Sequence, residues 1–145
     1  MSFSAVGEGR MLRVTLGAAA NYDAGMRAAA HMVGQMISRR IQVGIATGPH
    51  SGRLYGSHQA SAPGEYPAHW HGQLISSIGY TVDSSRQFRV GSTGAHNRGF
   101  DYAVGLHEGT SKMAPRPYIT KAVTENAAAI TTTLGAVTWR KVLGG

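Results

Sequence analysis

Residues 23–41, DAGMRAAAHMVGQMISRRI, carry the pattern on which the prediction of the fold depends. Their apolar side chains recur every three or four positions, which places them on one face of an α-helix about 28 Å long. Asn21 and Asp23 are suitable N-caps. Gly25 and Gly34 each disfavour the helix by about 1 kcal/mol relative to alanine, so we expect packing to stabilise it. The apolar positions are Met26, Ala29, Ala30, Val33, Met36, Ile37 and Ile41.

Several short segments outside this helix favour β-strands. Ile78, Tyr80 and Val82 alternate along the chain, which would place them on one face of a strand. Turn residues lie between the segments at short spacing, which favours antiparallel connections over helical crossovers. The predicted strands are residues 11–16, 73–82, 88–91 and 102–106, with one more at 135–145 around Val137 and Trp139.

A second helix is predicted near the end of the chain. Pro115 and Pro117 interrupt the preceding segment, and apolar residues at helical spacing follow over residues 118–134. We therefore expect an α+β fold in one domain, residues 1–145. An antiparallel sheet of about four strands would pack against a long N-terminal helix and a C-terminal helix.

Residues 44–72 form a long stretch without a regular apolar pattern, rich in glycine, proline, serine and histidine. Its length exceeds the 12–15 residues or so that a compact domain tolerates without a functional reason. Its large apolar side chains are unfavourable in water and suit docking against a partner. We predict an interaction arm that becomes ordered on a partner outside the monomer. Its interface residues would be Arg53, Leu54, Tyr55, Tyr66 and Trp70.

The composition narrows the class of protein. Only 14% of the residues are charged, against about 25% in an average soluble domain, and 20 are glycine, which is typical of a surface covered by neighbours. No cysteine is present, which excludes disulfides, thiolate zinc sites and a cysteine nucleophile. The chain lacks a long apolar stretch and a signal-peptide pattern, so we expect a soluble protein made in the cytoplasm, with no membrane contact.

The sequence gives little support for a catalytic site or a metal site. His69 and His71 flank Trp70, and in a strand both imidazoles would face one side, where His107 or Glu108 could complete a zinc site. The alternative is a pair of ordinary loop histidines. The chain lacks a Gly-x-Ser-x-Gly elbow and a phosphate-binding loop. We predict no enzyme activity, metal or cofactor, with a metal-dependent enzyme as a rival hypothesis.

The net charge of +7 raises a second rival, a basic nucleic-acid-binding module. No run of more than two cations occurs, and the aromatic residues are sparse and scattered. Nucleic-acid modules usually cluster basic residues and interleave aromatic ones for stacking. The charge alone therefore does not favour specific binding.

Residues 102–122, YAVGLHEGTSKMAPRPYITKA, carry the most informative motif. They resemble the signature of the tail-component or tail-completion proteins of long-tailed bacteriophages, in which Tyr-Ala, His-Glu-Gly-Thr and Arg-Pro-Tyr-Ile follow in that order. Segments 51–55, 62–67 and 72–78 also fit, so the resemblance covers most of residues 23–130. His71, Gln73 and Gly105 depart from the pattern. The matching residues are Tyr102, Ala103, His107, Glu108, Gly109, Thr110, Arg116, Pro117, Tyr118, Ile119 and Ala122.

The resemblance implies a structural role in the virion. Copies of the chain, six in number, would close into a ring at the neck or the top of the tail. The ring would contact adjacent neck and tail proteins and leave a channel for genomic DNA. Assembly would take place in the host cytoplasm. Within the motif, we predict that Glu108 and Arg116 stabilise the turn before the last helix.

Overall fold

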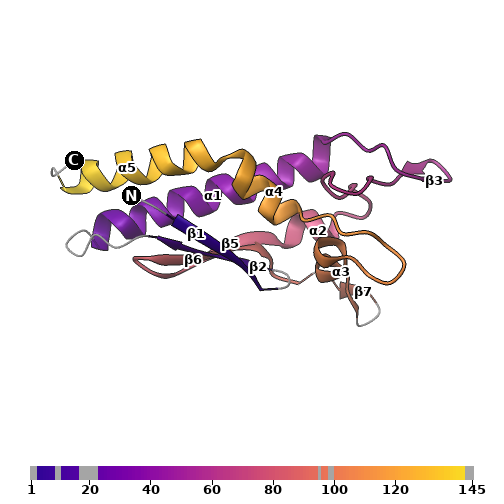
Figure 1. Ribbon diagram of the computed structural model, residues 1–145, viewed down its shortest axis with the longest axis horizontal. Coiled ribbons are helices and arrows are strands. Elements are labelled where there is room, and N and C mark those ends of the chain that lie inside the picture. The colour runs from indigo at the N-terminus through magenta and orange to yellow at the C-terminus, as the bar shows by residue number, and fades with distance from the viewer. Residues whose placement is uncertain (1–2, 9–10, 17–22, 95, 98–99, 143–145) are drawn as a thin grey trace.

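Helix α1 (Asp23–Thr47) runs along the molecule between helix α5 (Ala127–Val142) and an antiparallel sheet (Figure 1). Figure 1 shows a computed structural model that describes residues 3–8, 11–16, 23–94, 96–97 and 100–142. The predicted α+β class is confirmed.

The sheet pairs strands that lie far apart in the sequence. It contains, in spatial order, β1 (Phe3–Glu8), β2 (Met11–Leu16), β6 (Gln87–Ser92) and β5 (Ile78–Ser84). Neighbouring strands are antiparallel throughout. Phe88 and Val90 are two residues apart on β6 and both are fully buried, since alternate side chains of a strand share a face. The strands predicted at 11–16 and 88–91 are confirmed, whereas β1 was not predicted.

Close packing around α1 explains how a helix with two glycines is stable. A Cβ at Gly34 would lie 2.5 Å from Cδ2 of Tyr80 on β5, so this approach requires glycine. Toward α5, Thr138 donates a hydrogen bond to the sulfur of Met26 at 3.8 Å. The helix continues past its predicted end at Ile41 to Thr47.

The segment predicted as a strand at 73–82 contains a helix and a strand. Residues Gln73–Ser77 form helix α2, and β5 begins at Ile78, where the backbone turns extended. The Ser77 hydroxyl bonds the backbone oxygen of Leu74 and the Ser92 hydroxyl, both at 2.7 Å. These local bonds stabilise the junction between α2 and β5.

The strand predicted at 102–106 is wrong, because these residues belong to helix α3 (Tyr102–Glu108). A short ribbon, β7 (His96–Asn97) with β8 (Phe100–Asp101), precedes it. The Asp101 carboxylate accepts a hydrogen bond from the backbone N–H of Ala103 at 3.1 Å. This N-cap contact favours a helix over the strand that the short apolar alternation suggested.

The C-terminal prediction also needs correction. The predicted helix 118–134 is divided at Asn126 into α4 (Tyr118–Glu125) and α5, and α5 continues through most of the region predicted as a strand. Ile130, Leu134 and Val137 are buried on α5, and their spacing of four and three residues is helical. Residues 143–145 lie outside the described part of the chain.

Residues 48–72, called the arm below, connect α1 to α2. Within it, β3 (Leu54–Tyr55) and β4 (His58–Gln59) form a two-stranded hairpin. Figure 1 shows this hairpin projecting beyond the end of α1. Residues 53–59 are called the arm tip. The predicted irregular region begins later than expected, because α1 takes up residues 44–47.

Candidate functional site

The motif that carries the resemblance forms a helix, a turn and a second helix. Helix α3 ends at Gly109, whose φ of 84° favours glycine. A Cβ at this position would lie 2.9 Å from the backbone oxygen of Met113. Thr110 and Met113 exchange backbone hydrogen bonds of 2.8 and 3.2 Å. Residues 109–117, called the turn below, are therefore a compact unit.

Arg116, near the end of the turn, holds the arm in place. Its Nε donates to Oγ of Ser61 at 2.7 Å, and its Nη2 donates to the Ser61 backbone oxygen at 2.6 Å. Its Nη1 donates to the backbone oxygen of Ala114 at 3.1 Å. Ser61 itself is buried. The fork of a guanidinium can make all these bonds at once, so Arg116 joins the arm to the turn.

Glu108 does not share this role. Its side chain is exposed, and within the described part of the chain it makes no hydrogen bond or ion pair. The predicted stabilisation of the turn therefore comes from Arg116, through the arm and Ala114, and not from a contact between Arg116 and Glu108.

Other motif residues lie in the interior. Ala103 and Tyr118 are fully buried, and the His107 ring meets the Tyr118 ring edge-on with centroids 5.5 Å apart. Burial lowers the pKa of His107 and raises the pKa of Tyr118. Pro117 lies at the N-cap position of α4. Ala103, His107 and Tyr118 thus lie where α3 meets α4, whereas Pro117 is exposed at the end of the turn.

A single carboxylate organises the arm. Glu65 accepts hydrogen bonds from the backbone N–H groups of Ser51 at 3.0 Å and Ala62 at 2.7 Å, and from the Ser51 hydroxyl at 2.5 Å. The Ser51 hydroxyl and then the backbone N–H groups lower the pKa of Glu65 from 4.5 to about 2. The base of the arm is therefore held by hydrogen bonds within this chain, while ordering on a partner stays a prediction.

Tyr66 was predicted as an interface residue, and the structure places it in the protein's own core. Its side chain is 9% exposed. A Cβ at Gly44 would lie 2.6 Å from its ring, so α1 packs directly on it. Its hydroxyl donates to the Glu125 carboxylate at 3.0 Å, and Lys121 lies over the ring. Tyr66 therefore anchors the arm to α1 and α4.

The other predicted arm residues are exposed. Leu54, Tyr55 and Trp70 are 62%, 53% and 52% exposed, so more than half of each of these large side chains faces solvent. The Arg53 guanidinium lies 5.4 Å from the centroid of the Tyr55 ring. The ring of His58, which pairs with Tyr55 in the hairpin, contacts the Trp70 ring at an interplanar angle of 49°, with centroids 3.8 Å apart. The arm tip therefore presents a cation and large apolar groups to solvent.

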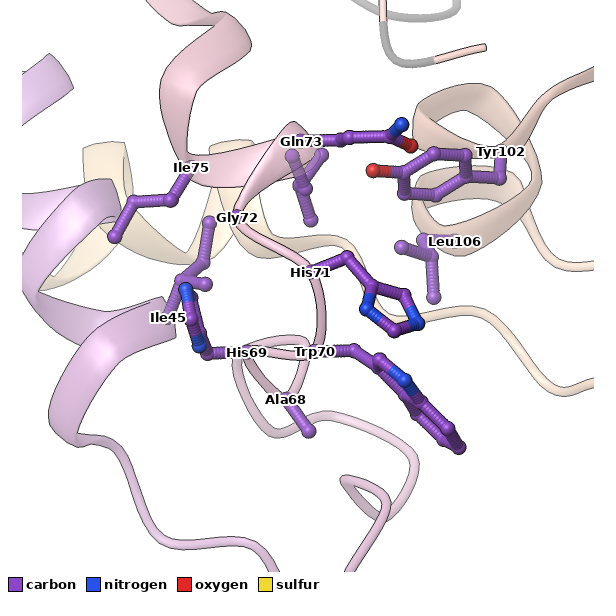
Figure 2. A pocket seen from close by; sticks show the side chains of 11 residues that line it. Ile45, Ala68, His69, Trp70, His71, Gly72, Gln73, Ile75, Tyr102 and Leu106 are labelled. Carbon is purple, nitrogen blue, oxygen red and sulfur yellow. The ribbon is translucent and has the colours of Figure 1, made fainter. Parts of the chain in front are cut away.

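A cavity of about 360 Å³ lies at the base of the arm (Figure 2). Figure 2 shows Trp70 and His71 on the side of Tyr102 and Leu106, whereas His69 lies beside Ile45. The rival zinc site would need the imidazoles of His69 and His71 to face the same point, and they do not. No group of three or more His, Cys, Asp or Glu side chains suited to a metal ion occurs among the residues that the structure describes. The remaining lining residues are Ala68, Gly72, Gln73, Leu74 and Ile75.

Comparisons with protein families, with curated proteins and with solved structures find no match for this chain. Among the described residues, no helix is long and apolar enough to cross a membrane.

Sequence reasoning missed the residues that hold the arm. Glu65 bonds the N–H three residues before it, the same spacing as the Glu of a capping box, so the Ala62-Pro63-Gly64-Glu65 pattern was a usable signal. Ser61 had no such signal, because its partner Arg116 lies 55 residues away.

Proposed function

We propose that this chain is a structural virion protein of a long-tailed phage. It forms a ring, of six copies, at the head-tail junction or the top of the tail. The ring completes the tail, joins it to the capsid and leaves a central channel for DNA without sequence-specific contact. The resemblance of residues 102–122 and of three upstream segments supports this role.

The observation that carries the proposal is the exposed arm tip. Glu65 and Arg116 hold the arm in a defined shape, yet Leu54 and Tyr55 remain largely exposed. A preorganised segment loses less conformational entropy on association than a disordered one. Such a segment is suited to repeated contacts between subunits, and contacts between two different patches are what close a ring.

Hydrogen exchange on free protein and on purified particles tests the proposal. We expect amides of the arm base, such as those of Gly52 and Ala60, to be protected in both samples. The Gly52 N–H donates to the backbone oxygen of Ala60, and the Ala60 N–H donates to the backbone oxygen of Arg53. Amides of the arm tip should gain protection only in particles. Equal, strong protection of the tip in both samples, or absence of the chain from particles, would overturn the proposal.

A titration with duplex DNA distinguishes the nucleic-acid rival. A monomer that binds DNA with a steep salt dependence and forms no oligomer would favour that rival. Weak, non-specific binding by the assembled ring agrees with a DNA channel.

A further inference from the structure

Glu108 differs from the other acidic side chains that the structure describes because it forms no hydrogen bond or ion pair. The chain has 7 acidic residues against 14 Lys and Arg, so its carboxylates are scarce. Five of the acidic side chains that the structure describes have a hydrogen-bond or ion-pair partner, while Glu108 is exposed and forms neither. The engaged residues are Asp23, Glu65, Asp83, Asp101 and Glu125.

The surroundings of Glu108 form a shallow, largely polar recess with exposed apolar groups beside it. Residues 108–115 line an open cavity of about 440 Å³. Ala114, Pro115 and Pro117 are exposed at the turn. The recess also contains Lys112, which is exposed and forms no ion pair with Glu108 in the structure. A rigid surface with prolines is a good platform for an aromatic side chain.

The arm tip has the complementary features. Arg53 is exposed, lies over Tyr55 and has no carboxylate partner among the described residues. Leu54 and Tyr55 beside it are exposed apolar groups. An arginine next to a tyrosine is also the composition typical of an interface hot spot.

We propose that the arm tip of one copy docks on the turn of the next copy, with Arg53 paired to Glu108 and Leu54 and Tyr55 against the prolines. This inference rests on the proposed ring. Charge complementarity selects a second copy as the occupant, because the unpaired cation of the tip matches the unpaired carboxylate beside the turn. Figure 1 shows the hairpin and the turn as separate projections at the same end of the molecule.

The contact joins two different patches, so each copy offers one tip and one turn. Such a heterologous contact repeats around an axis until the ring closes. Arg116 and Ser61 set the direction of the arm relative to the turn of the same chain, because they bond the two segments directly. A fixed direction is what gives successive contacts the same rotation.

Charge reversal tests the pairing. Arg53→Glu and Glu108→Arg should each abolish the ring in size-exclusion chromatography with light scattering, since like charges would meet at every contact. An equimolar mixture of the two variants should restore it, because both kinds of contact in an alternating ring then join opposite charges. Arg27→Glu is the matched control and should assemble normally, since Arg27 is exposed near the start of α1, whereas the arm follows the end of that helix.

Disulfide formation gives a second test, because the chain has no cysteine of its own. Tyr55→Cys and Pro115→Cys, made in separate variants, should form crosslinked dimers when mixed and oxidised, and neither alone should do so. Failure of the mixed charge variants to assemble, together with failure to crosslink, would overturn the docking.

The outcomes separate this inference from the proposed function. If the wild-type ring forms and both charge variants assemble normally, the docking is wrong and the ring stands. If rings of the variants form but no longer attach to particles, the tip meets an adjoining protein, and the docking between copies is also wrong. If the wild-type chain is monomeric and absent from particles, the proposed function itself fails.

Discussion

The guanidinium of Arg116 bonds both the hydroxyl and the backbone oxygen of Ser61, at 2.7 and 2.6 Å, although the residues are 55 positions apart. This pair connects the motif turn to the arm. It explains why an arginine, and not a lysine, suits the position, since a lysine lacks the planar fork.

Arg116→Ala should destabilise the protein by about 2 kcal/mol, because a charged donor is removed and the buried oxygens of Ser61 lose their partner. Chemical denaturation followed by circular dichroism measures the change. Arg53→Ala is the control and should alter the free energy of unfolding by less than about 0.5 kcal/mol, since its side chain is exposed. Equal stability of Arg116→Ala and wild type would contradict the role of Arg116 in holding the arm to the turn.

Glu65 should make the arm sensitive to acid. The pKa of Glu65 is lowered from 4.5 to about 2 in the folded chain. The ionised carboxylate therefore stabilises the fold above about pH 4.5, and this contribution disappears as the pH falls toward 2. The stability difference between wild type and Glu65→Gln should therefore be present at pH 7 and narrow below about pH 4. Denaturation curves of both proteins between pH 7 and pH 2 measure it, and a difference that stays constant with pH would refute the assignment.

Two glycine substitutions should act in opposite directions. Gly34→Ala should destabilise the protein by about 1–3 kcal/mol, because the new Cβ would overlap the Tyr80 ring. Gly135→Ala, within α5, meets nothing within 4 Å and should stabilise it by about 1 kcal/mol through helix propensity. Thermal unfolding of the two variants checks both signs. A neutral Gly34→Ala would mean that α1 and β5 lie further apart than described.

Tyr66→Phe should cost about 1 kcal/mol of stability, because it removes the hydrogen bond to Glu125. Assembly should be unaffected, since Tyr66 belongs to the core and not to the interface. Tyr55→Phe provides the comparison and should leave stability unchanged, because Tyr55 is exposed. Denaturation measures the stability of each variant, and light scattering measures its assembly. If Tyr66→Phe folds but does not assemble, Tyr66 takes part in the interface after all.

Helix α1 and strands β2 and β6 could be predicted because their apolar periods are local. Helix α3 could not, because a few apolar residues at 102–106 fit a strand as well as a helix until the Asp101 cap is seen. The same ambiguity affected Val137, whose place on α5 depends on its packing beside Leu134. Among the interface predictions, Leu54, Tyr55 and Trp70 are exposed as a docking surface needs, while Tyr66 is not.

By itself, the sequence determined the α+β class, the long central helix and the irregular character of the segment that follows it, since composition and periodicity act between near neighbours. Only the tertiary structure decided which residues hold the arm and which remain free. Ser61 and Arg116 bond across 55 positions, and Gly34 matters only because Tyr80 comes to rest against it. Such contacts depend on the path of the whole chain, which no local pattern contains.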